Sequence, residues 1–106
     1  MNVVKITVLA RDLREDLVRD YGAAGLGRCP EFEVGQEFLV TTTGKPDGFC
    51  SEAWDCIEHY VFALLHGAEQ PFFDGGWIRQ PGLAINTCND GLRPVTFRIE
   101  RVSGDE

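Results

Sequence analysis

The chain has little positive charge. Ten lysine and arginine residues stand against seventeen aspartate and glutamate residues, so the 106-residue chain carries a formal net charge of −7 at pH 7. The basic residues are also scattered singly, as at Arg11, Arg14, Arg19 and Arg28. Nucleic acids and anionic membranes both attract cationic surfaces. We therefore expect neither nucleic acid nor a membrane as a partner.

Long apolar runs and a leader pattern are missing as well. Met1 to Lys5 leads directly into a strand pattern without a basic n-region or a small-residue cleavage site. The longest apolar run is far shorter than the roughly 20 residues that span a bilayer. These absences predict a cytoplasmic protein, in which the four cysteines stay reduced rather than forming a disulfide framework.

Several familiar motifs are absent. The chain has no phosphate-binding Gly-Lys-Ser/Thr loop, no dinucleotide fingerprint after a strand, no Gly-x-Ser-x-Gly elbow and no Cys-x-x-Cys. The usual zinc-ribbon and thioredoxin spacings are thereby excluded. What the chain does have is the size of one domain, residues 1–106, and 43% hydrophobic residues for a single modest core.

The first third of the chain predicts a strand and a short helix. Val3 to Ala10 alternates apolar and polar residues, which is typical of a half-buried strand. Asp12 and Glu15 form a capping-box pattern, with Asp12 as the N-cap. A narrow apolar stripe follows at helical spacing and ends at Gly22. With one stripe only, this helix is expected to lie on a sheet.

The remainder predicts a longer helix and three more strands. Residues 32–40 have strand character with a turn or bulge at Gly35, and residues 83–88 and 95–102 form a hairpin around Asn89-Asp90-Gly91. Ser51 is the expected cap of a helix that ends near His66. Its core stripe comprises Ala53, Trp54, Ile57, Tyr60, Val61 and Leu64. The predicted fold is α+β, a small and mainly antiparallel sheet covered by two helices.

Three of the four cysteines fall at turn signals. Cys29 precedes Pro30, Cys50 precedes the long helix, and Cys88 opens the hairpin turn. Loops can bring distant thiols together, so Cys29, Cys50 and Cys88 are candidate ligands for zinc, copper(I) or an iron–sulfur cluster. Cys56 or a histidine would supply a fourth ligand. The alternative is that these cysteines are small packed hydrophobes.

Individual residues suggest further chemistry. Cys50 at a helix N-terminus is a candidate nucleophile or acid, although Asp47, Glu52 and Asp55 oppose thiolate formation there. Arg93 follows the hairpin turn and can reach a carboxylate or phosphate, but an ion pair with a nearby acid is the favoured interpretation.

Other polar and aromatic residues have weaker claims. Trp54, Asp90 and Arg93 are the candidate ligand-binding residues. Asp90 is also needed for the turn. His59 and His66 are possible general bases, yet histidines on the outer face of a helix are more often simply solvated.

Three motifs taken together resemble a known family. They are Cys29-Pro30-x-Phe32-x-x-Gly35, Gly48-Phe49-Cys50-x-x-Ala53-Trp54 and Cys88-x-Asp90-Gly91-Leu92-Arg93-Pro94-Val95-x-Phe97. The chain resembles a family of small prokaryotic domains of about this length, found singly, in tandem, or beside ferredoxin-like cluster domains. The resemblance implies a redox or anaerobic setting and includes the three loop cysteines. It implies no catalytic residue, and Cys56, His59 and His66 lie outside its pattern.

The sequence therefore leaves three hypotheses for function. The first is a cysteine-centred module that binds a metal or small ligand, linked to a redox partner. The second is a small enzyme that uses Cys50. The third is an interaction module that acts through Phe62 and the aromatic loop at 71–77. The exposed aromatic residues also predict a homo-oligomer.

Overall fold

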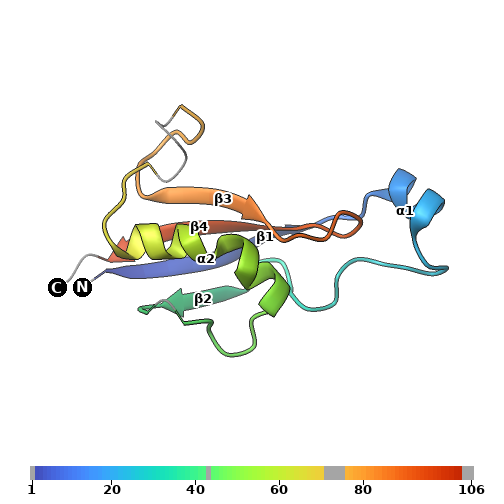
Figure 1. Ribbon diagram of the computed structural model, residues 1–106, viewed down its shortest axis with the longest axis horizontal. Helices are drawn as coiled ribbons and strands as arrows, with labels where there is room; N and C mark the ends of the chain where they lie inside the picture. The colour runs from blue at the N-terminus through green and yellow to red at the C-terminus, as the bar shows by residue number, and fades with distance from the viewer. Residues whose placement is uncertain (1, 43, 71–75, 104–106) are drawn as a thin grey trace.

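The four strands form one antiparallel sheet. The structure is a computed structural model that describes residues 2–42, 44–70 and 76–103. Its elements are β1 (Val3–Arg11), α1 (Glu15–Tyr21), β2 (Glu37–Val40), α2 (Ser51–Leu65), β3 (Leu83–Thr87) and β4 (Val95–Ser103). The strand order is β2-β1-β4-β3, and each neighbouring pair is antiparallel (Figure 1). The predicted α+β class is confirmed.

The core lies between one face of this sheet and α2. Alternate residues of β1 and β4 point to that face and are fully or almost fully buried, because side chains of a strand alternate between its two sides. The helix supplies Ala53, Trp54, Ile57, Val61 and Leu64 from its apolar stripe. Figure 1 shows α2 lying across the sheet. The prediction that this stripe, with Trp54, faces inward is confirmed.

The first helix differs from its prediction in two respects. It begins at Glu15 and has no side-chain cap. Asp12 is not its N-cap, because the backbone N–H groups of Asp12 and Arg14 donate to the carbonyls of Pro94 and Leu92, at 2.9 and 2.8 Å. The chain thus stays paired beyond β1. Within the described residues α1 contacts no other helix or strand, and it projects from one end (Figure 1). It does not cover the sheet as expected.

Two predicted turns form for different reasons. Gly35, at φ 92°, turns the chain before β2, so the strand expected over 32–40 is only Glu37–Val40. The β3–β4 hairpin is present, but Gly91 does not have the positive φ that its sequence suggested. The carboxylate of Asp90 holds the turn instead, accepting the N–H groups of Leu92 and Arg93.

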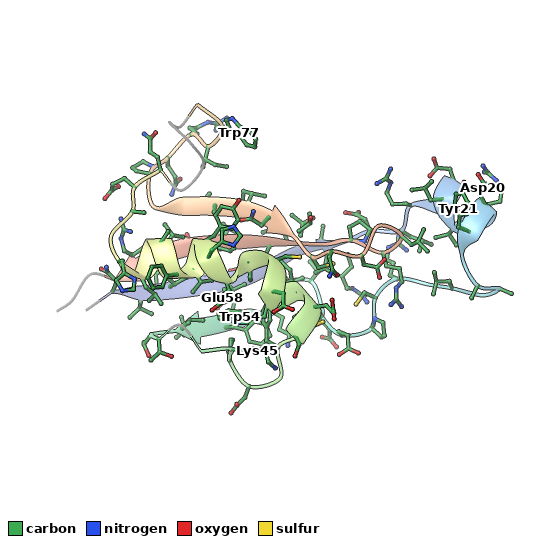
Figure 2. The ribbon with its side chains drawn as sticks, in the orientation of Figure 1. Asp20, Tyr21, Lys45, Trp54, Glu58 and Trp77 are labelled. Carbon is green, nitrogen blue, oxygen red and sulfur yellow. The ribbon has the colours of Figure 1, made fainter. Side chains whose placement is uncertain are left out.

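The aromatic loop at 71–77 lies only partly within the described residues. Phe72 and Phe73 lie outside the described residues, whereas Trp77 is exposed in the loop that precedes β3 (Figure 2). Among the helices that the structure describes, none combines the length and apolar character required to cross a membrane.

Candidate functional site

The cysteines gather around one end of the sheet. β1 ends and β4 begins there, since Arg11 pairs with Val95. Cys88 follows the last residue of β3 and pairs with Val95 as well. The guanidinium of Arg11 donates to the carbonyl of Cys29 at 2.8 Å, which holds the Cys29 loop at the same end. All four thiols are free, partly buried and packed against the core.

Cys56 and Cys88 lie within electrostatic range of each other at this end. Val95 is buried beneath α2, and Cys88, its cross-strand neighbour, points to the same side of the sheet. The amide of Asn89 donates to a carboxylate oxygen of Glu52 at 2.8 Å, which ties the turn to the first turn of α2. Cys56 lies one helical turn beyond Glu52 on the same side. Both thiols therefore occupy the junction of α2 with the β3–β4 turn.

The groups around this junction shift the pKa of Cys56. Burial raises the pKa of the Cys56 thiol, and the negative charges of Cys88, Asp55 and Glu52 raise that pKa further. The influence of Cys88 exceeds that of either carboxylate. Each of these influences favours the protonated thiol of Cys56.

An ion pair stands beside Cys88. Asp90 accepts the Nε–H of Arg93 at 3.0 Å. Partial burial favours a higher pKa for Asp90, but hydrogen bonds from the Leu92 and Arg93 backbones and from the guanidinium outweigh it, so this pKa is lowered. The ion pair favoured for Arg93 is confirmed.

Arg93 also connects two of the cysteines. Its hydrogen bond to Asp90 raises the pKa of the guanidinium against a smaller opposing effect of burial, and the negative charges of Asp90, Cys29 and Cys88 contribute to the rise. The guanidinium therefore lies within electrostatic range of both sulfurs.

Cys50 lies at the predicted start of the helix, but its side chain does not cap the helix. It is the N-cap residue of α2, and its backbone carbonyl accepts the N–H of Trp54 at 2.9 Å. Its side chain makes no capping hydrogen bond. The nucleophile assignment for Cys50 gains no partner from these contacts.

The predicted metal ligands do not form a ligand set. Across residues 2–42, 44–70 and 76–103, no three or more Cys, His, Asp or Glu side chains are arranged to hold a metal ion. Zinc and an iron–sulfur cluster both need several such ligands in contact with the metal. Cys29, Cys50 and Cys88, as placed, do not meet that requirement.

The histidines and Trp54 lie elsewhere. His59 and His66 are exposed on α2, where their rings lie against Tyr60 and Phe62 at centroid distances of 4.1 and 4.2 Å. Trp54 is buried and packs edge to face against Phe49. Figure 2 labels Trp54 on α2. A ligand-binding role for Trp54 stays a prediction.

Sequence reasoning missed the proximity of Cys56 to Cys88 and named Cys56 only as a possible fourth metal ligand. The signal for Cys88 was the alternation of β3, because Ala84, Asn86 and Cys88 occupy every second position. Extending that alternation one residue past the strand would have turned Cys88 toward α2.

No protein-family model, curated protein or solved structure matches this chain. The resemblance to the small prokaryotic family therefore stays a prediction.

Proposed function

We propose that this protein is a thiol–disulfide redox module with Cys56 and Cys88 as its working pair. The observation that carries the proposal is the proximity of these two thiols where α2 meets the β3–β4 turn. The predicted cysteine-centred site is thus retained, with Cys56 in place of a loop thiol. Cys29 and Cys50 lie around the pair.

The two sulfurs have different surroundings, which suggests different roles. Cys88 accepts the N–H of Val95 at 3.4 Å and lies within electrostatic range of Arg93, so it is the attacking sulfur. Cys56 has a raised pKa, so it is the resolving thiol. Asp90 orients the guanidinium through its ion pair.

The partner is a protein or small molecule that carries a disulfide. The thiolate of Cys88 attacks one partner sulfur, which forms a mixed disulfide and releases the other partner sulfur as a thiolate. Cys56 then loses its proton and attacks the Cys88 sulfur, which releases the second partner thiolate. Overall, the Cys56–Cys88 dithiol gives two electrons and two protons to the partner disulfide.

This chemistry suits a cytoplasmic protein with a redox partner. Cytoplasmic thiols are reduced at rest, and disulfides that form there are usually transient, catalytic or redox-sensing. The acidic surface of a chain with net charge −7 favours a partner that presents basic residues around its disulfide.

Equilibration in glutathione redox buffers tests the proposal. Anaerobically purified protein is alkylated at each potential and mapped by mass spectrometry. We expect two of the four thiols to be lost together and a Cys56–Cys88 peptide cross-link to form. The variants C56S and C88S should each abolish the cross-link, whereas the control variants C29S and C50S should keep it.

Two results would count against the redox pair. One is a protein whose four thiols stay alkylatable even in the oxidised buffer. The other is a metal-bearing preparation, with about one equivalent of zinc or a visible cluster spectrum that C29S, C50S and C88S each remove. The second result would return the site to the metal-binding hypothesis.

A further inference from the structure

The sheet has a second face that α2 does not cover. Lys5 and Thr7 of β1 point to it, together with Leu39 of β2 and Ile85 of β3, since their neighbours in each strand face the core. Leu39 is 66% exposed and Ile85 is 36% exposed. Figure 1 shows α2 on one side only, and α1 projects away from the sheet. We refer to this surface as the open face.

One row across the open face is self-complementary. Strand register aligns Leu39 with Lys5, Lys5 with Glu100, and Glu100 with Leu83. The row therefore reads apolar, cation, anion, apolar. A two-fold axis that runs along the strands between β1 and β4 would set Lys5 opposite Glu100 of a second copy. The same axis would set Leu39 opposite Leu83 of that copy, as an isologous interface requires.

The charges of the open face balance one another. Lys5 lies 3.7 Å from Glu37, and Arg98 lies 3.0 Å from Glu100. These two pairs leave the open face without net charge on a chain that carries −7 overall. Like-charge repulsion between copies is therefore smallest here, and a strongly basic or acidic partner gains no attraction.

A hollow beside β3 fits the same geometry. Its volume is about 590 Å³, and its walls include Trp77, Ile78, Leu83 and Ile85. Figure 2 shows Trp77 in the loop beyond β3. The two-fold axis between β1 and β4 would bring β2 of a second copy over β3. The exposed Leu39 of that copy would then face the hollow, whose walls include Leu83 and Ile85 as well as the polar Gln70 and Arg79.

We propose that the open face docks a second copy of this chain, sheet against sheet, around that axis. At about 4.8 Å between strands and about 3.3 Å per residue, the four strands present roughly 430 Å² to a facing sheet. This footprint is smaller than the ~800 Å² per partner of a standard interface. The dimer should therefore be weak, and a second copy bound this way leaves the cysteine end accessible.

Sedimentation equilibrium over a wide range of protein concentration tests the dimer. The wild type should pass from the 11.8 kDa monomer to twice that mass as concentration rises. L39E and I85E should each weaken association by about tenfold or more, because a carboxylate would be buried against apolar groups. Both residues are exposed in the monomer, so the variants should fold, which circular dichroism checks.

F62E is the matched control. Phe62 is 50% exposed on α2, away from the open face, so F62E should dimerise as the wild type does. A mixing experiment tests the axis. K5E and E100K should each associate poorly alone, because like charges would face each other in both homodimers. An equimolar mixture should recover association, since each variant side chain would then face its opposite charge.

Three outcomes would overturn the proposal. The first is a wild type that stays monomeric at several hundred micromolar, which would leave the open face to a different partner. The second is dissociation by F62E but not by L39E, which would move the interface to α2. The third is a K5E and E100K mixture that associates no better than either variant alone. The thiol measurements are made separately, so failure here leaves the redox proposal standing.

Discussion

The two helices of this protein have similar sequence patterns but pack very differently against the sheet. Both have an apolar stripe at helical spacing, and both were expected to cover the sheet. α2 has fifteen residues and buries five of them, whereas α1 has seven residues and buries none. Burial stabilises α2, while α1 is held mainly by the backbone hydrogen bonds at its base. Periodicity predicts a helix but does not say whether a surface is available to receive it.

The largest expected difference is between the aromatic residues of the two helices. Trp54→Ala removes a buried side chain of α2 and should lower the free energy of unfolding by about 3–5 kcal/mol. Tyr21→Ala removes a side chain that is 79% exposed and should change that free energy by less than about 0.5 kcal/mol. Tyr21 is labelled on α1 in Figure 2. Urea denaturation measures both. Equal losses would mean that α1 packs on the body of the protein in solution.

A smaller difference is expected between two arginines. Arg101 donates to the carbonyls of Leu64 and Ala68 at the end of α2, at 3.1 and 2.9 Å. Arg101→Ala should cost about 1.5–3 kcal/mol, because these helix-end carbonyls would lose a charged donor.

The matched change is Arg19→Ala in α1. Arg19 pairs only with the adjacent and exposed Asp20 among the contacts that the structure describes, so its loss should be nearly neutral. Thermal unfolding ranks the two variants. A larger loss of stability for Arg19→Ala than for Arg101→Ala would mean that Arg19 stabilises the protein through more than its ion pair with Asp20.

The smallest expected effect is a pH dependence at the base of α1. Asp90 has a lowered pKa in the folded protein, so its contribution is fully present above the unfolded value of about 3.9 and is lost as pH falls through the folded value. Asp90→Asn should therefore cost about 1 kcal/mol at pH 7, and the gap to wild type should close below about pH 4. Unfolding free energies at pH 7, 5 and 3 test this. A gap that stays constant with pH would show that the carboxylate charge does not matter.

Much of the fold was predictable because it depends on local patterns. The α2 stripe and the alternation in β1 and β4 follow from side-chain periodicity, and both are confirmed. The position of α1 was not predictable, because it depends on carbonyls of Pro94 and Leu92 that lie some eighty positions along the chain.

For the candidate site, the sequence predicted several of the residues but not their arrangement. Sequence identified Cys88, Asp90 and Arg93, and the Asp90–Arg93 ion pair is confirmed. Which thiol lies near Cys88 depends on where the β3–β4 turn meets α2. The hydrogen bond between Asn89 and Glu52 holds the turn at that place. Spacing along the chain carries no information about such a contact.

The pairing of β1 with β4 has a consequence for biosynthesis. β1 comes from residues 3–11 and β4 from residues 95–103, yet they are neighbours at the centre of the sheet. When the ribosome has released the chain only as far as β3, it has not yet released β4, which lies between β3 and β1 in the sheet. Closure of so long a loop is slow, and until it occurs the apolar faces of β1 and α2 stay in contact with solvent or a chaperone. Folding of this sheet therefore waits until β4 has been synthesised, and it is then nearly all-or-none.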